Sequence, residues 1–214
     1  TGCKNPANIR MFRKVFNKLF ENARVSVDND LSGAARALCG KEKGIACILG
    51  TGSNSCYFNG SRIVKNSPGL GFILGDEGSG AYLGKKVIQH YLYNIFDEDL
   101  RARFDAKFVT NETAIIEAVY KKPLPNRFLA SFSLFIAENR GHYMIENIIE
   151  DGINDFFSMH IINYRESEKL PIHFTGGIAY GFKDVVAQLC LNYSLKPGLF
   201  LKSPMEGLVK YHQE

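Results

Sequence analysis

Several features that would point to other classes of protein are missing from this sequence. It has no tryptophan, and none of its five cysteines forms the C-x-x-C spacing of zinc or iron–sulfur sites. No apolar run approaches the roughly 18–20 residues of a membrane-spanning helix, and residues 11–20 form an amphipathic pattern unlike a signal peptide. The net charge of +4 comes from scattered residues, without the basic stripe of a nucleic-acid-binding protein.

What is present is the composition of an ordinary globular protein. Hydrophobic residues make up 45% of the 214 residues and charged residues 22%, so the chain can bury a substantial core. Apolar neighbours surround the cysteines, which indicates reduced, mostly buried thiols of the kind found in the cytosol. We therefore expect a cytoplasmic protein that binds neither nucleic acid nor membrane. The cysteines are Cys3, Cys39, Cys47, Cys56 and Cys190.

Hydrophobic periodicity predicts an α/β chain. Asn5 and Pro6 are typical of a helix start, and the apolar residues after them recur at helical spacing. The Asn59-Gly60 pair predicts a hairpin turn within an antiparallel meander over residues 44–65. The other expected elements are a strand at 24–27, a helix at 32–38, helices near 83–95, 111–120, 126–138 and 141–164, a strand at 171–175, a helix at 182–193, a strand at 198–201 and a C-terminal helix.

Glycine-rich segments are the candidates for phosphate binding, because glycine lets backbone N–H groups approach an anion. The segment from Gly80 to Lys86 has the wrong spacing for a Walker A loop and lacks its Ser or Thr. The segment Gly50-Thr51-Gly52 precedes an expected strand, whereas a Rossmann fingerprint precedes a helix. Considered alone, the segment Gly50-Thr51-Gly52 is typical of a hairpin turn. Gly176-Gly177, also considered alone, is typical of a tight strand-to-helix connection.

Taken in chain order, however, these segments resemble one family. The segments are 27–35 (VDNDLSGAA), 48–55 (ILGTGSNS), 69–80 (GLGFILGDEGSG), 174–177 (FTGG) and 203–207 (SPMEG). Together they are similar to the N-acetylglucosamine kinases of the actin/hexokinase superfamily of ATPases. The wider group includes the ATPase activators of benzoyl-CoA reductase and 2-hydroxyacyl-CoA dehydratase. The resemblance covers almost the whole chain, and its most specific parts are the GTGSNS and LGDEGSG segments.

The resemblance implies an α/β, ribonuclease-H-like ATPase fold of the actin/hexokinase type. Residues 1–40 would be the end of an N-terminal lobe, residues 41–202 a complete C-terminal lobe with a helical insertion near 78–164, and residues 203–214 a C-terminal helix. Kinases of this fold carry a first phosphate loop near the N-terminus that this chain lacks. We therefore expect that the native protein extends upstream of Thr1-Gly2-Cys3, and that this chain alone is inactive.

The resemblance also implies the roles of individual residues. Asp30 would be the general base that accepts the proton of a sugar hydroxyl. Magnesium would come with ATP and be held mainly by ATP phosphates and water, and we name no metal-binding residue. Leu70 departs from the pattern, since an aromatic residue is common at this position in relatives that stack a sugar ring. The implied ATP contacts are Gly50, Thr51, Gly52, Ser53, Gly176 and Gly177. The implied sugar contacts are Thr51, Asn54, Gly69 and Asp76.

Other interpretations of these residues remain. Asp30 suits a helix N-cap, and Asp76 and Glu77 suit the start of the next helix. His160, on an apolar helical face, is typical of a hydrogen-bonded packing residue. The leading function is phosphorylation of an amino sugar, with N-acetylglucosamine and its 6-hydroxyl as the expected substrate and position. The alternatives are an ATPase activator of a partner redox enzyme and a non-catalytic sugar-binding regulator. A homodimer is expected by analogy with relatives.

Overall fold

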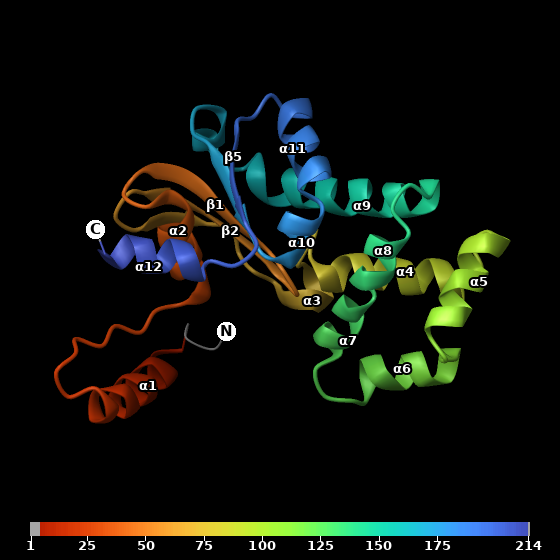
Figure 1. Cartoon of the computed structure of the whole chain (residues 1–214), viewed down its shortest axis with the longest axis horizontal. Coiled ribbons are helices and arrows are strands. Elements are labelled where there is room, and N and C mark those ends of the chain that lie inside the picture. The colour runs from red at the N-terminus through yellow and green to blue at the C-terminus, as the bar shows by residue number, and fades with distance from the viewer. Residues whose placement is uncertain (1–4, 214) are drawn as a thin grey trace.

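The computed structural model describes residues 5–213, and its sheet lies among helices (Figure 1). The sheet has five strands in the order β3-β2-β1-β4-β5. The strands are β1 (Lys43–Leu49), β2 (Ser53–Asn59), β3 (Ile63–Asn66), β4 (Ile172–Thr175) and β5 (Pro197–Leu201). The expectations placed on Thr1, Gly2 and Cys3 lie outside the described residues.

The sheet is mixed, and its register confirms the expected meander. β1 and β2 are antiparallel with Leu49 opposite Ser53, and β2 is antiparallel to β3 across the turn at Gly60, where φ is +92°. β4 is parallel to β1, and β5 is parallel to β4. The carboxyl ends of β1, β4 and β5 therefore meet at one edge of the sheet.

Both faces of the sheet are covered by helices. α2 (Asp30–Cys39) and α12 (Met205–Gln213) lie on one face, where Leu31 and Ala35 pack with Ala46 of β1. The alternate residues of β1, among them Ile45 and Cys47, face the larger core on the opposite side. α9 (Tyr143–Phe156), α10 (Gly177–Gly181) and α11 (Lys183–Asn192) cover that second face.

The connection between β3 and β4 is helical. From α4 onward it forms an arm that extends from the sheet and returns through α9 (Figure 1). The arm is held together by an aromatic cluster in which Phe104 contacts Phe108, Phe132 and Phe135. The whole connection from β3 to β4 consists of α3 (Gly71–Leu74), α4 (Gly80–Leu92), α5 (Glu98–Lys107), α6 (Glu112–Tyr120), α7 (Pro125–Ser131), α8 (Ser133–Glu138), α9, the π-helix η1 (Phe157–Ile161) and the 3-10 helix η2 (Arg165–Glu168).

The N-terminal helix α1 (Pro6–Leu19) stands apart from this body (Figure 1). Asn5 caps it as expected, accepting a hydrogen bond from Ala7 N at 2.9 Å. None of its residues is buried, and its apolar face, which includes Phe12 and Phe16, is exposed.

The structure corrects several expectations about elements. The strand expected at 24–27 is wrong, because this segment pairs with no strand among residues 5–213 and runs as irregular chain into α2. The helix expected at 126–138 is divided at Phe132 into α7 and α8, and the helix expected at 141–164 changes to a π-helix at Phe157. α5 was not expected at all.

Two expectations drawn from composition can also be compared with the structure. Cys39, Cys47, Cys56 and Cys190 are buried free thiols, as expected; Cys3 lies outside the described residues. Among the helices of residues 5–213, none is both long and apolar enough to cross a membrane.

Candidate functional site

The candidate site lies at the carboxyl edge of the parallel strands, where open α/β sheets commonly bind ligands. The turn Gly50–Gly52 follows β1, and Gly176 follows β4 at the same edge. The two strands run side by side with Ile48 opposite Thr175. Segments separated by more than 120 residues in the sequence are thereby brought together.

Hydrogen bonds to α4 fix the conformation of the Gly50–Gly52 turn. The amides of Gly80 and Ala81 donate to the carbonyls of Gly50 and Thr51 at 2.7 and 3.1 Å. These bonds satisfy helix N–H groups that lack a partner within the helix. The turn's own amides at Thr51 and Gly52 donate to no acceptor among residues 5–213. The turn thus offers free backbone donors, as an anion-binding loop requires.

Gly176 is in a conformation that only glycine adopts readily. Its φ is +114°, and a Cβ atom at this position would lie 2.3 Å from the carbonyl oxygen of Leu49. Gly176 therefore packs directly on the end of β1, next to Gly50. Gly177 begins α10, and apart from its chain neighbours and its own helix no atom of residues 5–213 lies within 4 Å of where its Cβ would be.

Asp30 is the first residue of α2 and is exposed to solvent. Its interpretation as the N-cap is wrong, because the side chain of Asn29 caps the helix and accepts from Ser32 N at 2.8 Å. The Asp30 carboxylate accepts from Leu31 N at 3.0 Å. Because Asn29 caps the helix, Asp30 can face the cavity described below.

Asp76 occupies a left-handed conformation with φ of +57°, which Asp tolerates better than most residues. Its Oδ1 accepts from Ser53 N at 3.3 Å, and a Cβ on Gly52 would lie 2.9 Å from its Oδ2. Burial raises the pKa of Asp76, the Ser53 N–H lowers it, and the neighbouring Glu77 raises it further.

The helix-cap interpretation of Asp76 and Glu77 is also wrong. Ser79 is the N-cap of α4, and its Oγ accepts from Tyr82 N at 3.2 Å. Glu77 instead contacts His160, whose Nε2 lies 3.0 Å from Glu77 Oε2. His160 is buried and hydrogen-bonded, as the packing interpretation expected.

One cavity of about 530 Å³ brings most of the expected site residues together. Gly176 and Gly177 do not line it, although Gly176 packs against Gly50, which does. The expected residues that do line it are Asp30, Gly50, Thr51, Gly52, Ser53, Asn54, Gly69 and Asp76.

Asn126 and Phe72 also line this cavity, and sequence reasoning missed both. Asn126 is on α7, which packs closely on α4: a Cβ on Gly80 would lie 3.3 Å from Cβ of Ala130, one turn after Asn126. Phe72 is in the 69–80 segment, between two residues already singled out. Asn126 had no signal of its own, because only the packing of α7 on α4 brings it to the cavity.

Two observations indicate that the residues of this cavity fit a polyphosphate ligand. The free amides of the turn are the first, and the second is the Oγ of Ser53, which is buried without a hydrogen-bond partner among the described residues. Thr175 Oγ1, immediately before Gly176, is likewise buried and unpartnered within residues 5–213. In the same part of the chain no group of three His, Cys, Asp or Glu side chains could hold a metal ion.

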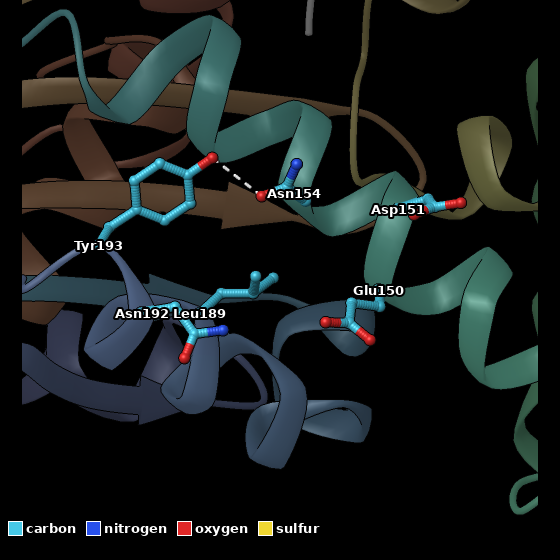
Figure 2. Close-up of a pocket in the computed structure, with 6 residues that line it drawn as sticks. All are labelled: Glu150, Asp151, Asn154, Leu189, Asn192 and Tyr193. Atoms are coloured by element: carbon cyan, nitrogen blue, oxygen red, sulfur yellow. Dashed lines mark hydrogen bonds between the residues drawn. The ribbon is translucent and has the colours of Figure 1, made fainter.

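A second cavity, of about 390 Å³, lies between α9 and α11 (Figure 2). Glu150, Asp151, Asn154, Leu189, Asn192 and Tyr193 line it. Tyr193 donates its hydroxyl to Asn154 Oδ1 at 2.9 Å. None of the expected site residues lines this second cavity, so we do not assign the candidate site to it.

No family model matches this chain, but solved structures and a curated protein are similar to it. A solved structure from Porphyromonas gingivalis, described as a candidate N-acetylglucosamine kinase, is 42% identical with a TM-score of 0.94, over 99% of this chain and 75% of that one. One from Chromobacterium violaceum, described in the same way, is 19% identical with a TM-score of 0.68, over 94% and 71% of the two chains, and shows the fold alone.

A curated relative is the N-acetyl-D-glucosamine kinase of Dictyostelium discoideum. It is 36% identical to this chain over 75 residues. The match covers 35% of this chain and only 24% of that enzyme.

Proposed function

This chain belongs to the family of N-acetylglucosamine kinase-like proteins, and from that membership we propose that it transfers the γ-phosphoryl group of ATP to an amino sugar. The substrate we propose is N-acetylglucosamine, phosphorylated at its 6-hydroxyl. The observation that carries the proposal is the single cavity that holds Asp30, the Gly50–Ser53 turn and Asp76 together. A kinase needs these three parts within reach of one another: a base, a phosphate-binding loop and an acceptor for sugar hydroxyls.

We also propose the finer description of the fold. The strand order, with an antiparallel meander followed by two parallel strands, supports a ribonuclease-H-like lobe of the actin/hexokinase type. On this proposal residues 41–202 form the lobe and the helices of 78–164 its insertion. α2 would be the helix that carries the catalytic base to the nucleotide-binding edge.

On the nucleotide side, the free amides of Thr51 and Gly52 and the hydroxyl of Ser53 would hold phosphate oxygens of ATP. Gly176 and Gly177 would let the backbone approach the adenosine, since neither carries a side chain. Magnesium would come with ATP and would be held by phosphate oxygens and water. When bound, it would neutralise the charge on the transferred group.

On the sugar side, Asn54, Gly69 and Asp76 would hold the hydroxyl and acetamido groups. Asp30 would accept the proton of the attacking sugar hydroxyl while the oxygen of that hydroxyl forms a bond to the γ-phosphorus of ATP. The bond from that phosphorus to the β-bridging oxygen breaks, and ADP leaves with the electron pair. Asp30 is exposed at the first turn of α2, so an incoming sugar can reach its carboxylate.

The experiment that tests this proposal is an ADP-release assay on the full-length native protein, with MgATP and a panel of sugars. We expect release that depends on sugar and is fastest with N-acetylglucosamine. Asp30→Asn should lower kcat by roughly 10²- to 10⁴-fold, the usual contribution of a general base. Release that ignores both the sugar and Asp30 would defeat the proposal and favour the ATPase alternative.

The matched control for Asp30→Asn is Asp28→Asn. Asp28 is also exposed and lies two residues away, but it does not line the cavity. Its carboxylate contacts Arg36 at 3.6 Å. We expect Asp28→Asn to keep its activity. A loss of activity in Asp30→Asn alone would then not come from the altered charge near α2.

A further inference from the structure

His160 connects two segments of the chain that both border the candidate site. Its Nε2 lies 3.0 Å from Glu77 Oε2, and its Nδ1 lies 2.8 Å from Ser67 Oγ. The side chains of His160 and Glu77 are 7% and 18% exposed, so solvent competes little for these bonds. Glu77 and Ser67 are 83 and 93 residues from His160 in the sequence.

The ring of His160 is held by aromatic stacking as well as by its two hydrogen bonds. It lies in the π-helix η1 and stacks on Phe156, with ring centroids 4.9 Å apart. π-helical turns are rare and occur often at functional sites. A neutral imidazole with its proton on Nε2 would donate to Glu77 and accept from the Ser67 hydroxyl, so both ring nitrogens are used.

The same helical region holds the Ser67 segment at a second point. The hydroxyl of Tyr164 accepts from Ser67 N at 2.7 Å and shares a hydrogen bond with Ser55 Oγ at 3.0 Å. Ser67 is two residues before Gly69, and Glu77 directly follows Asp76. The segments fixed by His160 are therefore the ones that present Gly69 and Asp76 to the cavity.

We propose that His160 is a positioning residue for the sugar substrate. It does not line the cavity itself. By bonding Ser67 and Glu77 at once, it sets the spacing between Gly69 and Asp76, and that spacing decides how well sugar hydroxyls fit between them. The inference rests on the proposed sugar-kinase function. It predicts that His160 affects the sugar side of the reaction and leaves the nucleotide side unchanged.

The test is His160→Phe, which keeps a ring on Phe156 and removes both hydrogen bonds. Its KM for N-acetylglucosamine should rise about ten-fold or more, since bonds to a charged group are among the stronger ones. Its KM for MgATP should stay within about two-fold. Calorimetric titration with N-acetylglucosamine gives a second readout that does not depend on turnover. The Kd for the sugar should rise by the same factor.

Two further variants separate positioning from general destabilisation. His160→Gln keeps an amide that can donate to Glu77, and it should recover part of the sugar affinity. His90→Phe is the matched control: His90 also uses a ring nitrogen, 2.8 Å from Lys86 O, but lies on α4 and does not line the cavity. It should leave both KM values unchanged.

The outcomes are distinguishable. If the unaltered protein neither binds N-acetylglucosamine nor releases ADP in response to it, the proposed function fails and the inference fails with it. If the unaltered protein does both, but folded His160→Phe has the same sugar KM, the inference alone is overturned. An equal rise of both KM values would also overturn it, because His160 would then support the fold without positioning the sugar.

Discussion

At the scale of single residues, Gly176 shows how backbone geometry shapes the nucleotide side of the site. Because its φ is +114° and a Cβ would lie 2.3 Å from Leu49 O, any side chain must displace the end of β1 or the start of the Gly50 turn. The neighbouring Gly177 has neither constraint.

We expect Gly176→Ala to lower the free energy of unfolding by about 2 kcal/mol or more, from backbone strain and overpacking together. It should also weaken nucleotide binding, because the Gly50–Gly52 turn must shift. Denaturant unfolding and titration with MgADP measure the two effects. Gly177→Ala is the control and should change stability by less than about 1 kcal/mol. Equal effects of both substitutions on stability would contradict this account of Gly176.

At the scale of elements, the cap of α2 determines where the proposed base lies. Asn29 accepts from Ser32 N at 2.8 Å, which leaves Asp30 in the first turn and beside the cavity. α2 is anchored behind this cap, because Leu31, Ala35 and Leu38 pack against the sheet. If the cap were lost, this packing would keep α2 on the sheet while the exposed Asp30 lost its fixed position.

We expect Asn29→Ala to cost about 1 kcal/mol of stability, the usual value of an N-cap, and to lower kcat as Asp30 loses its fixed position. Asn29→Asp should retain most of both properties. Asn111 makes the equivalent cap on α6, accepting from Ala114 N at 2.9 Å, away from the cavity. Asn111→Ala should therefore lower stability by a similar amount and leave kcat alone. A similar fall in kcat for both alanine variants would refute the special role of the α2 cap.

Sequence patterns predicted the elements whose signals are local. The hairpin at Asn59-Gly60 and the apolar strands of the sheet were expected, and the structure confirms them. α5 was missed because, of its ten residues, only Leu100 and Phe104 are buried, which is too little for a clear apolar stripe. The strand at 24–27 was wrongly expected because alternation alone cannot show whether a partner strand exists.

Motifs in the sequence marked part of the candidate site. The cavity gathers Asp30, Gly69, Asp76 and the Gly50–Asn54 segment, which were singled out by resemblance to a family. Asn126 and the bond between Glu77 and His160 depend on how distant helices pack. No pattern within a short window carries that information, so the folded chain was needed to find them.

At the scale of the whole molecule, the parallel pair β4–β5 links stability to pH. His173 on β4 accepts a hydrogen bond at Nδ1 from Leu199 N of β5 at 3.0 Å. Burial lowers the pKa of His173 below its ordinary value. Since the unfolded chain then binds more protons than the folded one, the contribution of His173 to stability is complete above about pH 6.5 and is lost as pH falls toward the folded-state pKa.

We therefore expect the folded protein to lose stability between about pH 7.5 and pH 5, partly through His173. In His173→Gln, whose side-chain oxygen can accept from Leu199 N, the loss over this range should be smaller. Urea unfolding of both proteins at several pH values measures the difference. An identical pH dependence in the two proteins would show that His173 does not titrate in this way.

We propose above all that the residues of the cavity beside the Gly50–Gly52 turn catalyse transfer of the γ-phosphoryl group of ATP to the 6-hydroxyl of an amino sugar. The most direct measurement is proton-coupled phosphorus NMR of MgATP and N-acetylglucosamine incubated with the full-length native protein and with its Asp30→Asn variant. We predict a new phosphomonoester signal, split by the two protons of the C6 methylene, that grows with the protein and is lost with the variant. Inorganic phosphate as the only new signal, or an ester formed equally well by Asp30→Asn, would contradict the account.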